Sequence, residues 1–159
     1  MELEHHRPSK DEYYMMLAKT VATRGTCPKA LVGAVLVKDG SIISTGYNGA
    51  PVGEKHCSEA GHNEVDGHCQ RAVHAELNAI LQAAKHGNAT KDSTLYITHF
   101  PCNHCLKAIA NAGIKGIVYE VSYKNMENFI SLDHFELRQV KSSFAVQILD
   151  ISEKKVPLT

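Results

Sequence analysis

Apolar side chains near the N-terminus recur at intervals of three and four residues, which is the spacing of one face of an α-helix. They are Tyr13, Met16, Leu17, Ala18 and Val21. The pattern predicts an amphipathic helix over about residues 9–24. Ser9 and Glu12 stand three residues apart at its start, which is the arrangement of a capping box.

Two apolar runs rich in β-branched residues follow this helix after a Gly-Thr-Cys-Pro break. They cover residues 31–37 and 42–47, and a polar Lys-Asp-Gly-Ser turn separates them. Two such runs joined by a short turn with glycine predict a β-hairpin. The second run ends in a flexible Gly-Tyr-Asn-Gly turn at residues 46–49. Either this segment is only a turn, or Asn48 leaves the end of the strand pointing into a pocket, where its amide could bind a sugar hydroxyl.

Helical and strand patterns alternate between residues 72 and 121. Helical runs begin at His74 and cover residues 103–112, whereas residues 94–98 and 116–121 have the apolar pattern of strands. Strands joined by a helix are expected to lie parallel, with a right-handed crossover. The chain is therefore predicted to have an α/β fold.

The last third of the chain has a weaker pattern. Here we expect a helix at residues 123–132 and strands at residues 136–140 and 145–151. Residues 1–8 are polar and are expected to form a loose N-terminus. With this length and no internal repeat, residues 1–159 are predicted to form one domain with a substantial core.

The charges of the chain balance, with 17 basic and 17 acidic side chains. No lysine- or arginine-rich run is present, which argues against a nucleic-acid partner. No apolar run is long enough to span a membrane, and the charged N-terminus lacks the core of a signal peptide. The 5 cysteines are an odd number, and two of them have the spacing of metal ligands. We therefore expect no disulfide framework and predict the reducing cytoplasm as the location.

Two short motifs carry the candidate chemistry: His-Ala-Glu at residues 74–76 and Pro-Cys-Asn-His-Cys at residues 101–105. Cys102 and Cys105 are three residues apart, so a helix would present both sulfurs on one face. Pro101 suits the start of a helix, and thiolates there face the positive end of the helix dipole. Together with the imidazole of the first motif, they supply three ligands for zinc. Three is the number found in catalytic zinc sites, which leave one position for water.

Glu76 follows His74 by two residues, about 200° around an ideal helix, which is poor geometry for a second ligand. It is better suited to carry protons beside a zinc ion, which lowers the pKa of water to about 7. The predicted reaction is attack of hydroxide on an amidine-like carbon with loss of ammonia, as in zinc-dependent nucleobase deaminases. A lone Cys-x-x-Cys pair is more often a structural zinc knuckle or a redox pair. The combination with His74 and Glu76 favours a catalytic zinc.

A second group of metal-binding side chains lies in the long polar connection at residues 50–73. A loop of this length inside a compact domain usually needs a stabilising site or a function of its own. We predict a second, closed zinc site here, to which Cys27 is added from an earlier loop. The predicted ligands are Cys27, Cys57, His62 and, as the fourth, Cys69 or its competitor His68. The alternative is a set of scattered surface histidines and reduced thiols.

The chain resembles the cytidine deaminase superfamily and, more narrowly, the deoxycytidylate (dCMP) deaminases. It is similar to the bacterial branch sometimes labelled late-competence operon protein 2. The resemblance covers about residues 10–125. It is carried by Val-Gly-Ala-Val at 32–35, Gly-Tyr-Asn-Gly at 46–49, His-Ala-Glu-Leu-Asn-Ala-Ile at 74–80, Pro-Cys-Asn-His-Cys at 101–105 and Ala-Gly-Ile-Lys at 112–115.

The resemblance implies a cytidine deaminase-like three-layer sandwich, in which helices flank a five-stranded mixed sheet. It also implies hydrolytic conversion of dCMP to dUMP with release of ammonia. The family's zinc ligands match His74, Cys102 and Cys105. Its proton shuttle matches Glu76, Asn48 matches a residue that binds the deoxyribose hydroxyl, and Ala75 is a further expected substrate contact.

Regulation and assembly are also implied by the resemblance. Some members bind a second zinc at positions that match Cys27 and Cys57. Members are typically hexamers, activated by dCTP with Mg²⁺ and inhibited by dTTP. The resemblance also implies that the turn formed by Gly46, Tyr47, Asn48 and Gly49 takes part in that regulation. We therefore expect a homo-oligomer that binds nucleotides and neither nucleic acid nor membrane.

The contacts to the substrate phosphate do not follow from a motif. Arg24 lies in the first loop, Arg71 lies just before the catalytic helix, and Tyr123 follows the strand at residues 116–121. These three are the candidate nucleotide contacts. Each could equally be a surface or packing residue.

Three competing functions share part of this pattern. A tRNA adenosine deaminase has the same two motifs, but the balanced charge and the turn at residues 46–49 argue against RNA. Free-nucleoside cytidine deaminases often use a cysteine where His74 stands. A zinc-stabilised nucleotide sensor without turnover would have no need of Glu76.

Overall fold

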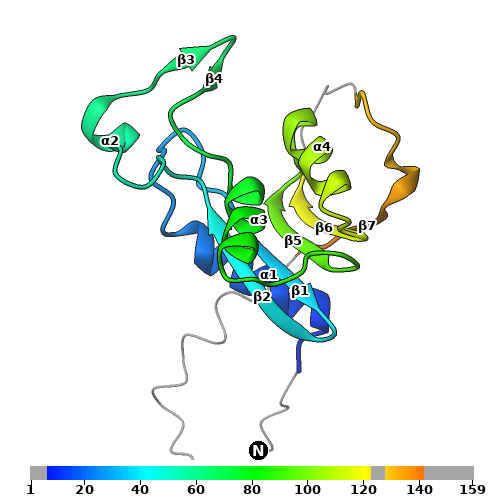
Figure 1. Cartoon of the computed structure of the whole chain (residues 1–159). Helices are drawn as coiled ribbons and strands as arrows, with labels where there is room; N and C mark the ends of the chain where they lie inside the picture. Colours follow the sequence, from blue (N-terminus) through cyan, green and yellow to red (C-terminus); the bar gives the residue numbers. More distant parts are fainter. Residues whose placement is uncertain (1–6, 123–127, 142–159) are drawn as a thin grey trace, which may run out of the picture.

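The computed structural model describes residues 7–122 and 128–141, and its centre is a five-stranded mixed sheet (Figure 1). The helices within these ranges are α1 (Lys10–Ala22), α2 (Cys57–Ala60), α3 (Ala75–Lys85) and α4 (Asn103–Asn111), with a 3₁₀ turn at Leu132–His134. Across the sheet, the strands are β2 (Ser41–Tyr47), β1 (Gly33–Lys38), β5 (Thr94–His99), β6 (Gly116–Val121) and β7 (Glu136–Gln139). A separate small hairpin consists of β3 (Glu64–Val65) and β4 (His68–Cys69).

The strand pairing confirms the predicted α/β fold. β1 pairs antiparallel with β2, as the hairpin pattern predicted, and its other edge pairs antiparallel with β5. β5 and β6 are parallel and are joined through α4, and β7 continues the parallel half of the sheet. The five-stranded mixed sheet that the resemblance implied is therefore present.

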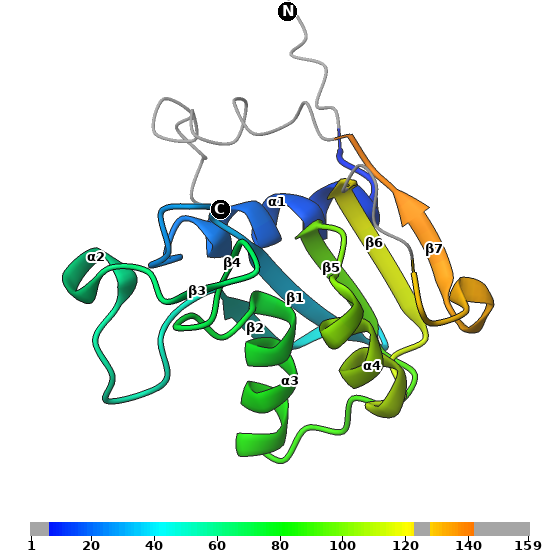
Figure 2. The ribbon, with the colours of Figure 1, turned by 90° about the horizontal axis from the view of Figure 1, so that it is seen from above.

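Helices cover both faces of the sheet and give three layers (Figure 2). α1 lies on one face, while α3 and α4 lie on the other. The side chains of β1 alternate between these layers: Val35 and Val37 pack in one core cluster with residues of α1, whereas Ala34 and Leu36 pack in the other with residues of α3. A strand buried on both faces reads as a continuous apolar run, which is what residues 31–37 show.

Two glycines let helices lie directly on strands. A Cβ atom at Gly33 would overlap the backbone of Ala18 in α1, and one at Gly46 would overlap the backbone of Ala75 in α3. Glycine is the residue that permits such a close backbone approach. The start of α3 is therefore held against the end of β2.

The predicted N-terminal helix is confirmed, including its capping box. The Ser9 N–H donates to Glu12 at 2.7 Å, and the Glu12 N–H donates to the Ser9 hydroxyl at 3.1 Å. The buried face is rotated from the predicted one, because Met15 is fully buried and Tyr13 is 46% exposed.

The predictions for the last third have mixed outcomes. The strand predicted at residues 136–140 is β7. The helix predicted at residues 123–132 is wrong where its residues are described: there the Phe129 N–H donates to the Asn103 side chain, and Ser131 caps the 3₁₀ turn. Residues 123–127 and the strand predicted at residues 145–151 lie outside the described residues. In the described ranges, none of the helices combines the length and apolar character needed to cross a membrane.

Candidate active site

Three metal-binding side chains from two helix N-termini meet at one edge of the sheet. His74 is the N-cap of α3, Cys102 is the N-cap of α4, and Cys105 lies in the first turn of α4. The Nδ1 atom of His74 lies 3.5 Å from the sulfur of Cys102 and 3.5 Å from the sulfur of Cys105. The structure thus brings together the three residues that the motif spacing singled out.

The backbone at His74 explains how Glu76 can lie beside the same group. His74 is extended, with φ −66° and ψ 150°, so it precedes the helix and does not occupy its first turn. The 200° separation of two positions on an ideal helix therefore does not apply. Pro101 lies two residues before the first helical residue of α4, not at the helix start as predicted, and it is fully buried.

The hydrogen bonds in this group favour a thiolate. Hydrogen bonds from the Cys105 thiol and from His74 lower the pKa of Cys102 to about 3. The Cys105 thiol donates the shared proton, so its own pKa is raised. The hydrogen bond to Cys102 also raises the pKa of His74. A metal cation that bound here would displace these protons.

Glu76 supplies a buried carboxyl group next to the three donors. Its side chain is only 4% exposed, and burial raises the pKa of the carboxyl group to about 7. Its carboxyl group shares a hydrogen bond with the Cys105 sulfur. A buried carboxyl group of this kind, in a cluster of charged groups, is typical of a group that transfers protons.

The donor set fits zinc. Two ligand atoms bound to one zinc at about 2.0 Å (nitrogen) and 2.3 Å (sulfur), at a tetrahedral angle, are about 3.5 Å apart. The Nδ1-to-sulfur distances of His74 are 3.5 Å. Two thiolates and an imidazole also match the ligand types that zinc prefers. These three side chains could hold one zinc ion with a fourth position open.

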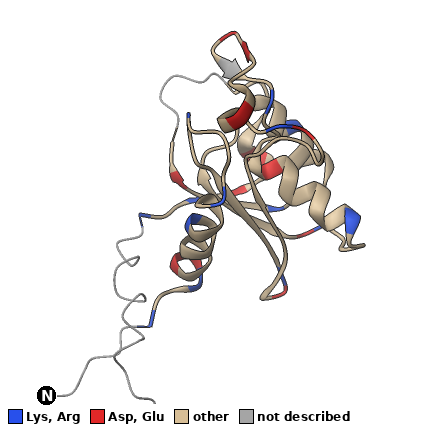
Figure 3. Ribbon diagram, turned by 90° about the vertical axis from the view of Figure 1, so that its left-hand side faces the viewer, with Lys and Arg blue, Asp and Glu red and all other residues tan. Residues whose placement is uncertain are grey.

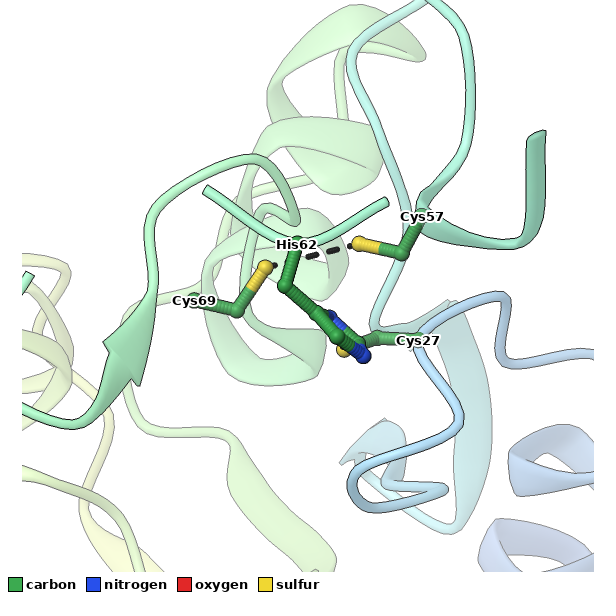
Figure 4. A group of neighbouring side chains, drawn as sticks. All are labelled: Cys27, Cys57, His62 and Cys69. Carbon is green, nitrogen blue, oxygen red and sulfur yellow. Dashed lines mark hydrogen bonds between the residues drawn. The ribbon is translucent and has the colours of Figure 1, made fainter. Parts of the chain in front are cut away.

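A second group of four donors comes from two loops: Cys27 lies in the loop between α1 and β1, and the other three lie in the loop that carries α2, β3 and β4 (Figure 4). It consists of Cys27, Cys57, His62 and Cys69, whose ligand atoms all lie within 4.8 Å of one another. The Cys27 sulfur is 3.6 Å from Nδ1 of His62, and the sulfurs of Cys57 and Cys69 are 3.4 Å apart. The structure therefore gathers the first three predicted ligands, and Cys69 stands as the fourth.

Local contacts position this second group and polarise its thiols. Cys69 sits on β4, and Lys29 reaches across to form an ion pair with Glu64 of β3 and to donate to the backbone of the hairpin turn. Burial alone would raise the pKa of Cys69, but hydrogen bonds from His62 and from backbone N–H groups lower it to about 6. Burial and the hydrogen bond to Cys69 raise the pKa of Cys57 to about 12. The thiolate form of Cys69 is therefore favoured, and it lies among the four donors of this group.

The Asn48 side chain ties two backbone segments together. Its Oδ1 atom accepts from the Val32 N–H at 2.9 Å, and its Nδ2 atom donates to the Ala30 carbonyl at 2.6 Å. The residue is 7% exposed. One amide hydrogen and one lone pair remain for another partner, since an asparagine side chain offers two of each.

The other predicted nucleotide contacts are more scattered. Arg24 is exposed in the loop after α1. Arg71 donates from Nε to the Gly61 carbonyl at 3.0 Å, so it supports the loop of the second metal-binding group. Ala75 is fully buried between His74 and Glu76. Tyr123 lies outside the described residues.

A groove of about 600 Å³ lies beside the turn at residues 46–49, between β2, the loop at residues 49–56 and α3. Gly46, Tyr47 and Gly49 line it, and so does Asn78 of α3. None of the three ligands of the first metal-binding group lines it. The groove is therefore a feature beside the candidate active site and not the site itself.

Residues 8–121 match the family described as "Cytidine and deoxycytidylate deaminase zinc-binding region". The chain belongs to this family. Within the family, it is 45% identical over 118 residues to ComE operon protein 2 of Bacillus subtilis, in an alignment that covers 74% of this chain and 62% of that protein. It is 40% identical over 123 residues to the deoxycytidylate deaminase of Mycobacterium phage D29, covering 71% of this chain and 95% of that one.

Solved structures show the same fold. The dCMP deaminase of the cyanophage S-TIM5, solved in complex with dCMP and dUMP, matches with a TM-score of 0.73 and 33% identity. The match covers 86% of this chain and 100% of that one. The fold of this deaminase family member is therefore that of a dCMP deaminase.

Asn78 is a residue of the candidate site that the sequence analysis did not single out. It lies one turn into α3, and its side chain donates to the carbonyl of Tyr47 at 2.8 Å. The only sign of a role for Asn78 in the sequence is its place in the motif at residues 74–80. Its hydrogen-bond partners are backbone carbonyls, which every residue has, so the sequence does not show these contacts.

Proposed function

We propose that this protein catalyses the hydrolytic deamination of dCMP to dUMP with release of ammonia. The observation that carries the proposal is the meeting of His74, Cys102 and Cys105 beside the buried carboxyl group of Glu76. The choice of dCMP is supported by relatives named deoxycytidylate deaminase and by the cyanophage enzyme that was solved with dCMP and dUMP. The chain spans 62% of the length of ComE operon protein 2. The proposal is therefore argued from the candidate active site and not from the name of that relative.

The proposed mechanism assigns the proton transfers to Glu76. A zinc ion held by His74, Cys102 and Cys105 would supply a Lewis acid that makes water a better nucleophile. The carboxylate of Glu76 accepts a proton from the attacking water and donates it to N3 of the cytosine ring. Glu76 then takes the proton of the new hydroxyl group on C4 and donates it to the amino group; the C4–N bond breaks, ammonia leaves, and the C4 carbonyl of uracil forms. Burial of Glu76 keeps these protons from exchanging with bulk water.

The second group of donors is proposed to hold a structural zinc. Four protein ligands complete a tetrahedral shell and leave no position for water, which is the pattern of a structural site. Cys57 is 5% exposed and Cys27 is 4% exposed, so a metal there would be shielded. Its role would be to fix the loop at residues 50–73.

The nucleotide contacts and the effector site are part of the same proposal. We assign Asn48 and Ala75 to the nucleoside, and Arg24, Arg71 and Tyr123 to the candidates for the remaining nucleotide contacts. We assign the turn at residues 46–49 and its adjoining groove to nucleotide effectors: dCTP with Mg²⁺ as activator and dTTP as inhibitor. The size of the groove beside this turn, about 600 Å³, supports a ligand of that class.

We further propose a homo-oligomer, a hexamer by resemblance, that works in the cytoplasm and binds no nucleic acid. Free thiols at all of the described cysteines suit a reducing compartment. Acidic and basic residues are interspersed along the ribbon, which suits small nucleotides better than a long phosphate backbone (Figure 3).

The test is ammonia release from dCMP, cytidine and adenosine-containing RNA by the wild type and by Glu76→Gln, with zinc measured by elemental analysis. We expect wild-type turnover of dCMP. We expect Glu76→Gln to keep its zinc and to lose about 10²-fold or more in kcat, because it can no longer move the protons. Cys102→Ala should lose both zinc and turnover.

Three outcomes would contradict this proposal. Preference for RNA would indicate a tRNA adenosine deaminase. No turnover of any substrate by zinc-loaded wild type would indicate a nucleotide sensor. A Glu76→Gln variant without zinc would show that Glu76 is needed for the metal and not only for proton transfer.

A further inference from the structure

Asn78 makes hydrogen bonds to both peptide units that flank His74. Its backbone N–H donates to the His74 carbonyl at 2.9 Å. Its side-chain Nδ2 donates to the Val73 carbonyl at 3.4 Å. The peptide unit before His74 and the peptide unit after it are therefore both held by one residue.

These two bonds restrain the backbone from which the imidazole of His74 projects. Rotation about φ of His74 turns the Val73–His74 peptide unit relative to the Cα atom, and rotation about ψ turns the following unit. The bond to the His74 carbonyl is the backbone bond of the helix, and the Val73 carbonyl accepts from both Asn78 Nδ2 and the Gly49 N–H, so both rotations are restrained. At the observed angles, φ −66° and ψ 150°, and with the observed side-chain rotamer, Nδ1 lies 3.5 Å from each sulfur.

The same side chain fixes this segment to the sheet. The second N–H of Nδ2 donates to the Tyr47 carbonyl at the end of β2, at 2.8 Å. A β-bridge between Gly49 and Val73 runs beside it, with N–H to carbonyl distances of 2.8 and 3.2 Å. Two donors on one nitrogen are needed to reach both Tyr47 and Val73, and an asparagine at this position supplies them.

We propose that Asn78 is a positioning residue of the active centre, which orients His74 as a metal ligand. The inference rests on the proposed metal-binding role of His74. Groups that orient a ligating histidine are worth about 10- to 100-fold in metal affinity or activity. Asn78 acts through the backbone of His74, not through the other ring nitrogen, and it also joins that ligand to the turn at residues 46–49.

The test compares Asn78→Ala with the wild type. Alanine has the best helix propensity, so the loss of the two donors is not confounded by a weaker α3. Asn88→Ala is the matched control, because Asn88 also donates from Nδ2 to a carbonyl of β2, that of Ile43 at 2.9 Å, far along the strand from His74. Zinc release to a colorimetric chelator is followed in each protein, and kcat and KM for dCMP are measured separately.

Zinc release from the wild type is compared with release from Cys102→Ala. The kinetic phase that is missing in Cys102→Ala is assigned to the zinc of the active centre. We expect Asn78→Ala to release this zinc about 10-fold faster and to lose about 10-fold in kcat with little change in KM. Asn78→Asp, in which a carboxylate faces two carbonyls, should release it faster still. Asn88→Ala should match the wild type in both measurements.

Two results separate the failure of this inference from the failure of the proposed function. If folded Asn78→Ala releases the active-centre zinc at the wild-type rate and keeps its kcat, the positioning role is wrong while the metal site stands. If the wild type has no zinc that Cys102→Ala removes, the metal-binding role of His74 is wrong and the inference falls with it. Should Asn78→Asp fail to fold, the comparison with Asn78→Ala decides alone.

Discussion

Asp11 shows how one carboxyl group connects elements that are far apart in the sequence. It lies in the first turn of α1 and accepts from the Tyr96 hydroxyl of β5 at 2.8 Å. It also accepts from two nitrogens of Arg138 in β7, at 2.8 and 3.1 Å. Burial alone would raise the pKa of Asp11, but the hydrogen bonds from Arg138 and Tyr96 outweigh it and lower the pKa.

Because the pKa of Asp11 is lowered in the folded protein, this carboxyl group makes the free energy of unfolding fall as the pH is lowered. The stabilisation by Asp11 is fully present above the pKa of an unfolded aspartate, about 3.9, and is lost as the pH falls through the lower folded value. We expect Asp11→Asn to lower the free energy of unfolding by about 1 kcal/mol near pH 7, a modest value because the Arg138 side chain is 46% exposed.

Urea unfolding of the wild type and Asp11→Asn over the range from about pH 7 to pH 3 measures this difference. We expect it to shrink below about pH 4. Asp39→Asn, in an exposed turn, is the control for the substitution itself. A difference that stayed constant over this range would mean that the ion pair contributes nothing measurable.

The sequence could predict single residues only where their partners are close in the chain or chemically distinctive. His74, Glu76, Cys102 and Cys105 were predictable because two short motifs contain them all, and metal ligands have few alternatives. Asn78 was not, because its partners are carbonyls that any residue offers. Arg71 stays a candidate nucleotide contact, and the sequence did not show that its Nε donates to Gly61 in the loop of the second metal-binding group.

At the scale of elements, Gly33 and Gly46 make a matched pair. Each lets a helix lie on a strand of the hairpin, α1 over β1 in one case and α3 over β2 in the other. Of these two helices, only α3 carries candidate site residues at its start. The two contacts therefore have the same structural role but different consequences for activity.

We expect Gly33→Ala and Gly46→Ala each to lower the free energy of unfolding by about 1–3 kcal/mol, because the added methyl group overlaps helix backbone. Gly46→Ala should also lower kcat for dCMP, since α3 must shift with His74 and Glu76. Gly33→Ala should keep its kcat at temperatures where it is folded. Thermal unfolding and steady-state kinetics on both variants test this, and an equal loss of kcat in the two would contradict it.

The elements that the sequence predicted well are those with a clear pattern of apolar residues. The alternating and continuous apolar runs became β1, β2, β5 and β6, because burial of a strand leaves its pattern in every second residue or in all of them. The exposed strand β7 was located as well. The segment at residues 128–132 was not, because a contact from Asn103, distant in sequence, fixes it.

At the scale of the whole molecule, the order of strands could not be predicted from the pattern. β1 pairs with β5 across a connection that contains α2, the small hairpin and α3. A hydrophobic pattern shows that both faces of β1 are covered but does not show which strand lies at its edge. The resemblance to a known family implied a five-stranded mixed sheet but not the order of its strands, which the structure supplies.

The second metal-binding group is the whole-molecule feature with the sharpest test. We expect freshly purified protein that has not met a chelator to contain about two zinc ions per chain, and Cys57→Ala to contain about one. Cys57→Ala should also be cut faster by proteases within residues 50–73, because the loop would lose its closing contacts. A zinc content near one in the wild type would remove the second site.

The position of Cys27 gives such a metal a wider consequence. Cys27 precedes β1, while Cys57, His62 and Cys69 all follow β2. An ion bound by all four would close a ring around the whole hairpin, and because the four ligands converge only in the folded chain, its binding free energy would add to the stability of the hairpin. A cell short of zinc would then lose this protein to degradation as well as to inactivity.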